Sequence, residues 1–346
     1  MRYSTLLPAR DDSMIDRRAF IGTAAVGALM LSSRANAQPA QRLPRVALVG
    51  LNSPVAKLPD ALNIRAFVGG LRDLGWIERR NIVIDYRSTE GRYDQMPRVM
   101  QEVLASPVAV IVSYDIGVFA ARRLTDTVPI VAVDTDGLVG AGAASLARPG
   151  GNLTGSTGEV GLTEMSIKRL ELLKEAAPKV SRVAFLTEMG PIWGPITNDP
   201  SWRGSIEAAA RVLGQTIVWV GASMPEDLEV AFDVISKARA NGLLVDGWVP
   251  APLRRSILEF AARQRLPAIY TGRGGPELGG LMSYGADNAE IWKRAATFVD
   301  KILKGAKAGD LPIEQPTKFD LVINEKTAKA LGLTVPQSLR LRAEVI

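Results

Sequence analysis

Polar and aromatic side chains gather at the ends of the apolar segments that we expect to form strands. The carboxyl ends of parallel strands meet at one edge of a sheet, where open α/β proteins bind their ligands. We therefore predict ligand contacts from residues at these ends. The candidates are Asn52, Ser53, Ser113, Tyr114, Asp115, Asp136, Glu188, Asp246, Trp248, Tyr270, Arg273, Ser283 and Tyr284. For each serine, aspartate or asparagine, capping of the following helix is an alternative role that stays open.

Four of these candidates are aromatic and cannot be explained as helix caps: Tyr114, Trp248, Tyr270 and Tyr284. A cleft with several rings and a few converging polar groups suits a small, partly apolar ligand, although packing within the protein is the alternative. The segment Met189–Trp202 carries two tryptophans and three prolines and follows a predicted strand. We expect this segment to determine which ligand this protein prefers.

The residue types that most enzymes need are missing. The chain has no histidine and no cysteine, which excludes every catalytic triad built on histidine and every thiolate nucleophile or thiolate metal site. No phosphate-binding loop is present, and the glycines at 272–275 do not have dinucleotide-binding spacing. We expect no catalytic residue, no metal ion and no cofactor. An exported enzyme that uses Asp or Glu chemistry on the same scaffold is the alternative.

Short apolar segments rich in β-branched residues alternate with segments of helical periodicity. The predicted strands are 45–51, 81–86, 108–113, 129–134, 182–187, 216–220, 242–246, 267–270 and 319–323. The predicted helices are 62–74, 95–105, 118–125, 163–176, 205–213, 228–240, 253–263 and 288–303. This alternation predicts parallel sheets covered by helices on both faces.

The strand–helix pattern occurs twice, with a break rich in Gly, Ser and Thr at 146–158. We predict an α/β protein with two doubly wound, Rossmann-like lobes joined by a multi-strand hinge. Lobe 1 comprises 45–155 plus 281–346, and lobe 2 comprises 156–280. Such hinges let lobes close around a ligand. Two independent domains in tandem are the alternative.

Residues 1–37 have the pattern of an export signal. A basic stretch with Arg17 and Arg18 precedes an apolar run too short to span a bilayer, and a small-residue site ends at Ala37. We expect cleavage near Ala37–Gln38, by the twin-arginine or the general secretory route, and a soluble protein in the periplasm. Translation from Met14 instead of Met1 is an alternative. The leader has five arginines and three aspartates, so its removal lowers the net charge of +6 by two, and we expect no nucleic-acid partner.

Several stretches resemble a known family along the whole chain. They are 17–22 (RRAFIG), 71–76 (LRDLGW), 84–87 (IDYR), 90–93 (EGRY), 146–155 (LARPGGNLTG), 279–285 (GGLMSYG), 311–319 (LPIEQPTKF) and 326–333 (KTAKALGL). In these stretches the chain resembles ABC transporter substrate-binding proteins of the tryptophan/tyrosine-transporter type.

The resemblance implies a type I periplasmic-binding-protein fold and a monomer that delivers a small molecule to an inner-membrane permease served by a separate ATPase. A sensor that engages a membrane signalling protein would use the same closing lobes and is a further alternative. Carried over by position, the pocket would include Ser53, Ser113, Asp136, Asp246, Tyr270 and Ser283. The turns at 113–115 and 187–191 depart from the usual family pattern, so the ligand stays open between an amino acid and another small aromatic or carboxylate solute.

Overall fold

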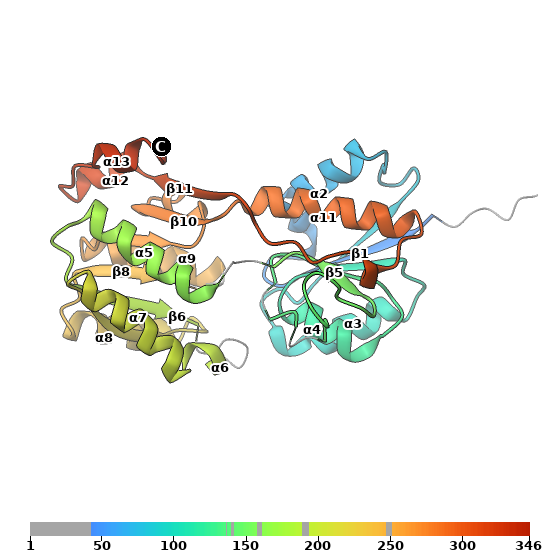
Figure 1. Cartoon of the computed structure of the whole chain (residues 1–346), viewed down its shortest axis with the longest axis horizontal. Helices are drawn as coiled ribbons and strands as arrows, with labels where there is room; N and C mark the ends of the chain where they lie inside the picture. The colour runs from blue at the N-terminus through green and yellow to red at the C-terminus, as the bar shows by residue number, and fades with distance from the viewer. Residues whose placement is uncertain (1–42, 136, 140–141, 158–160, 189–193, 247–250) are drawn as a thin grey trace, which may run out of the picture. The chain divides into compact units, whose positions relative to one another are not determined.

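The computed structural model describes residues 43–346 except 136, 140–141, 158–160, 189–193 and 247–250 (Figure 1). Contacts group the chain into two units, residues 1–43 and residues 44–346, and every element below belongs to the second. In the described part of the chain, no helix is both long enough and apolar enough to cross a membrane.

The first sheet has five parallel strands in the order β2-β1-β3-β4-β5. Its strands are β1 (Arg45–Gly50), β2 (Val83–Ser88), β3 (Val110–Ser113), β4 (Ile130–Ala132) and β5 (Leu153–Gly155). The associated helices are α2 (Leu62–Asp73), α3 (Met96–Leu104), α4 (Ile116–Leu124) and α11 (Asn288–Leu303), with 3-10 turns η1 (Val55–Asp60), η2 (Tyr93–Gln95) and η3 (Ala308–Asp310). Val46 and Leu48 pack in the cluster of α2 and α11, whereas Ala47 and Val49 pack in the cluster of α3 and α4. Because both faces are covered, the inner strands β1, β3 and β4 are mostly apolar, whereas the edge strand β2 carries Asp85 and Arg87.

The second sheet has seven strands in the order β12-β11-β10-β9-β8-β6-β7. They are β6 (Arg182–Thr187), β7 (Thr216–Gly221), β8 (Gly242–Val245), β9 (Ala268–Tyr270), β10 (Met282–Ala286), β11 (Phe319–Ile323) and β12 (Glu344–Val345). The helices are α5 (Leu162–Ala176), α6 (Gly194–Thr197), α7 (Pro200–Val212), α8 (Asp227–Lys237), α9 (Ala251–Arg263), α10 (Gly274–Glu277), α12 (Glu325–Ala330) and α13 (Gln337–Arg340). Only β10 and β11 pair antiparallel; all other neighbours are parallel. The two sheets confirm the predicted two-lobed α/β architecture.

The C-terminal segment is divided between the lobes, which differs from the single block 281–346 expected for lobe 1. Strands β10, β11 and β12 hydrogen-bond within the second sheet, whereas α11 lies beside α2 on the first (Figure 1). The segment after α11 also belongs to the first lobe, because Thr154 Oγ1 donates to the Leu311 carbonyl at 2.8 Å. The chain thus passes between the sheets at three places: after β5, between β10 and α11, and before β11.

Two strands lie in glycine-rich segments where we had predicted no strand. β5 lies in the predicted break at 146–158, and β10 lies at the end of the stretch 272–285. At Gly155, φ is 132° and a Cβ atom would lie 1.9 Å from the Ala132 carbonyl oxygen. Glycine is therefore required there by the close approach of β4, and the same residue that signals a turn in the sequence permits strand pairing.

Candidate ligand-binding site

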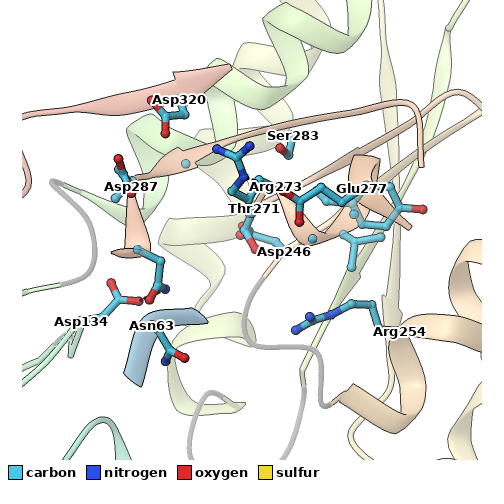
Figure 2. A pocket seen from close by; sticks show the side chains of 18 of the residues that line it. Asn63, Asp134, Asp246, Arg254, Thr271, Arg273, Glu277, Ser283, Asp287 and Asp320 are labelled. Carbon is cyan, nitrogen blue, oxygen red and sulfur yellow. Dashed lines mark hydrogen bonds and ion pairs between the residues drawn. The ribbon is translucent and has the colours of Figure 1, made fainter. Parts of the chain in front are cut away.

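A pocket of about 470 Å³ is lined by residues from both sheets (Figure 2). Seven of the predicted site residues lie on its wall: Asn52, Ser53, Tyr114, Asp246, Tyr270, Arg273 and Ser283. Six of the seven lie at or just beyond the carboxyl ends of β1, β3, β8 and β9, as expected for the ligand edge of parallel sheets. Ser283 comes instead from within β10, the strand that leads toward α11.

Four of the other predicted residues, which the structure describes, do not line this pocket: Ser113, Asp115, Glu188 and Tyr284. Ser113 is fully buried and donates its hydroxyl to the Val49 carbonyl at 3.0 Å, and Tyr284 stacks on Phe319 with ring centroids 6.0 Å apart. Asp115 lies at the start of α4, where its N–H donates to Thr135 Oγ1, and its φ is 46°. Glu188 is buried immediately after β6. Asp136 and Trp248 lie outside the described residues.

Asp246 is part of a buried ion pair. Its carboxylate accepts hydrogen bonds from Arg169 Nη1 at 2.9 Å and from the Ser166 hydroxyl, and Arg169 Nε donates to the Tyr284 carbonyl at 2.8 Å. Arg169 is wholly buried on α5. Its charge therefore neutralises Asp246, which we had predicted as a ligand contact. The sequence signal that we missed is an arginine on the buried face of a helix, next to Leu170.

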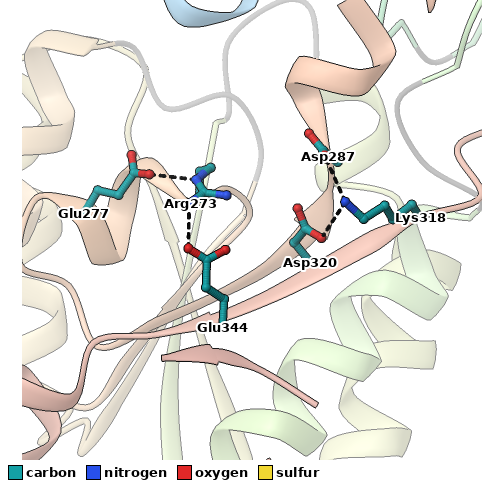
Figure 3. Close-up of polar contacts among 6 residues, drawn as sticks. All are labelled: Arg273, Glu277, Asp287, Lys318, Asp320 and Glu344. Carbon is teal, nitrogen blue, oxygen red and sulfur yellow. Dashed lines mark hydrogen bonds and ion pairs between the residues drawn. The ribbon is translucent and has the colours of Figure 1, made fainter. Parts of the chain in front are cut away.

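Three aspartates lie toward one side of the pocket in Figure 2: Asp134, Asp287 and Asp320. Asp134 accepts from Asn288 Nδ2 at 3.0 Å, and Lys318 Nζ lies 3.1 Å from Asp287 and 3.7 Å from Asp320 (Figure 3). Burial pulls the pKa of Asp287 upward, but hydrogen bonds from the Glu290 N–H and from Lys318 outweigh it and lower that pKa. Asp134, which was not among the predicted residues, follows β4 and lines the pocket.

Two arginines also line the pocket, and Arg254 lies on the side away from the three aspartates (Figure 2). Arg273 forms ion pairs with Glu277 at 2.7 Å and with Glu344 of the C-terminal strand at 3.1 Å (Figure 3). These two carboxylates raise the pKa of Arg273, and the hydrogen bond to Glu277 has the larger effect. Arg254 reaches into the pocket from α9 (Figure 2), and its burial lowers the pKa of the guanidinium. Arg254 was not predicted from the sequence, because nothing in the local pattern separates it from the exposed Arg255 beside it.

Aromatic rings complete the wall. Tyr114 meets Trp292 of α11 edge to face at 5.9 Å, and its hydroxyl accepts from the Leu51 N–H at 3.2 Å. Trp202, the last residue of the segment singled out in the sequence, also lines the pocket and lies 5.3 Å from Trp219. It sits on α7, whose first turn is capped by Asp199. Rings on both sides give the pocket large apolar surfaces beside its charged groups.

Tyr270 is fixed by two glycines of the turn that follows it. A Cβ atom on Gly275 would lie 2.5 Å from Tyr270 Cγ, and one on Gly280 would lie 2.6 Å from Tyr270 Cε2. We expect Gly275→Ala to lower the free energy of unfolding by about 1–3 kcal/mol, because the tyrosine ring must move to admit the methyl group. The measurement is thermal unfolding. Gly272→Ala is the matched control, since nothing lies within 4 Å of its added methyl group; equal losses in both variants would contradict the prediction.

The family model of the ABC transporter substrate binding proteins matches residues 60–346. The chain belongs to this family. Proteins of the family bind small molecules outside the cytoplasm and work with an ABC permease, so the pocket belongs to a solute receptor of a transporter.

Among its relatives is a tyrosine-binding protein of Clostridioides difficile, 23% identical over 272 residues that cover 78% of this chain and 76% of the relative. A conserved domain protein of Vibrio cholerae has a TM-score of 0.75 at 25% identity, covering 88% of this chain and 99% of that structure. A Streptococcus pneumoniae ABC domain in complex with L-Trp has a TM-score of 0.76 at 21% identity, covering 88% and 100%. The last of these shows the fold alone.

Proposed function

We propose that this substrate-binding protein captures an amino acid, or a similar small aromatic carboxylate, and delivers it to the permease. The observation that carries the proposal is the composition of one pocket: the partly buried guanidinium of Arg254, aspartates toward the other side, and rings from both lobes. A zwitterion with an apolar side chain matches all three features. The names of a tyrosine-binding relative and an L-Trp complex of the same fold point the same way.

Capture follows from the hinge. A ligand that touches both lobes binds more tightly when they are closed, and it shifts the population toward the closed form. The three connections between the sheets allow the lobes to rotate while each sheet stays intact. We infer that the protein acts as a monomer, that a separate ATPase drives the permease, and that the ligand is released chemically unchanged.

The experiment is a thermal-unfolding panel with L-tyrosine, L-tryptophan, other amino acids and benzoate. A ligand present at about 100 times its dissociation constant should stabilise the native state by about 2.7 kcal/mol. Mass spectrometry of the released ligand should recover it without chemical change. Absence of stabilisation by every amino acid and aromatic carboxylate would reject the proposed ligand class, and accumulation of a product would reject the receptor role.

Export completes the proposal. Residues 1–37 would direct the chain across the inner membrane, by the twin-arginine route suggested by Arg17 and Arg18, with cleavage near Ala37–Gln38. The mature protein would then be soluble in the periplasm. The N-terminal sequence of protein recovered from the periplasm tests the cleavage site, and replacement of both arginines by lysine tests the route.

A further inference from the structure

Glu188 is a buried carboxylate next to residues that line the pocket. It follows directly on Thr187, the last residue of β6, and its carbonyl accepts a 3.1 Å hydrogen bond from the hydroxyl of Thr197. Both threonines line the pocket, so Glu188 lies directly behind its wall although it is not itself a lining residue. The residue is only 6% exposed. Within the described residues, the carboxylate of Glu188 has neither a hydrogen bond nor an ion pair.

The other buried carboxylates of the described chain all have interactions. Asp134 accepts from Asn288, Asp246 is paired with Arg169, and Asp300 lies 2.7 Å from Lys304 Nζ. Asp115 likewise has an interaction with a partner. An ionised carboxylate is expensive to bury without a partner. Among the buried carboxylates of the described chain, Glu188 is therefore the one without a cationic partner, and a ligand could supply that cation.

Glu188 also acts electrostatically on Tyr93 of the first lobe. Burial is the main cause that raises the pKa of Tyr93 to about 12, and the negative charge of Glu188, followed by that of Asp115, raises it further. The Tyr93 hydroxyl donates to Asn52 Oδ1 at 2.6 Å, and Asn52 lines the pocket. The charge of Glu188 thus acts on a first-lobe tyrosine that is hydrogen-bonded to a residue of the pocket wall.

We infer that Glu188 receives the ammonium group of the ligand and makes the site prefer zwitterions to plain carboxylates. The inference rests on the proposed function and deepens it, because it names the group that recognises the positive end of the ligand. Arg254 remains the candidate that binds the ligand carboxylate. Two residues of the second lobe would then bind the ammonium and the carboxylate of one amino acid.

A pH dependence follows from this placement. Burial raises the pKa of Glu188 to about 7. A bound ammonium stabilises the ionised form, so affinity is complete above this pKa and falls as the pH drops below it. At a pH about one unit below, the affinity for a zwitterion should be about tenfold weaker. Tyr93 stays neutral over this range because its own pKa is about 12.

The test is calorimetry with L-tyrosine and with its analogue 3-(4-hydroxyphenyl)propanoate, which lacks the ammonium. At pH about 8, Glu188→Gln should weaken L-tyrosine binding at least tenfold and abolish the pH dependence, while the binding of the analogue changes little. The apo variant should unfold at no lower temperature than wild type, because a desolvated charge has been removed. Glu102→Gln, the same change at an exposed residue of α3, is the matched control and should keep wild-type affinity.

The outcomes separate the two proposals. If wild type binds L-tyrosine and Glu188→Gln has the same affinity and pH profile, the role of Glu188 is overturned while the proposed function stands. A variant that loses the amino acid and the analogue equally also overturns the inference, because the ammonium is then not what Glu188 reads. If wild type binds no amino acid at any pH, both proposals fail together.

Discussion

Replacing Asp246 with asparagine is expected to lower the free energy of unfolding by about 3–5 kcal/mol. The substitution removes the carboxylate that Arg169 Nη1 contacts at 2.9 Å and takes a negative charge away from a wholly buried guanidinium. The loss of this charge, more than the lost hydrogen bond, accounts for the size of the effect. Thermal and denaturant unfolding of the apo protein measure it, without any ligand.

The control for this prediction removes both partners. The double variant Arg169→Met with Asp246→Asn leaves no buried charge and should recover most of the stability lost by the single variant. A single variant that unfolds like wild type yet loses ligand affinity would contradict the prediction. It would instead make Asp246 the direct ligand contact that its position at the end of β8 first suggested.

Replacing Arg254 with glutamine is expected to weaken binding of amino acids by about 2–4 kcal/mol, or about thirtyfold to a thousandfold. The guanidinium lines the pocket and is partly desolvated, so its interaction with a ligand carboxylate is weakly screened. Glutamine keeps a hydrogen-bonding group of similar reach but removes the charge. Calorimetry with L-tyrosine or L-tryptophan measures the change.

Arg255→Gln supplies the matched control for Arg254, since it makes the same change at the next, exposed position of α9. It should leave both affinity and stability within the scatter of wild type. Equal losses in the two variants would indicate a general effect of net charge instead of a contact in the pocket. An Arg254→Gln variant with wild-type affinity would remove this residue from the site.

The sequence by itself determined the local elements and the edge of the sheets at which the pocket lies. Strand β6, strand β11 and helix α11 begin and end at the predicted residues, because their side-chain periodicity depends only on near neighbours and on burial of one or both faces. The predicted pocket edge followed from the same information. Polar residues after apolar strands converge wherever strands run parallel, which is why Asn52, Tyr114 and Tyr270 reach one pocket.

Only the tertiary structure decided which sheet each strand of the C-terminal segment joins and which charged side chains form ion pairs. Pairing of β10 and β11 in the second sheet depends on partners distant in the chain. The same holds for Arg169 and Asp246, which are 77 positions apart. Whether a carboxylate is neutralised or left for a ligand is set by such distant neighbours and by burial. Asp246 and Glu188 therefore look alike in the sequence, yet only Asp246 has an ion-pair partner in the described structure.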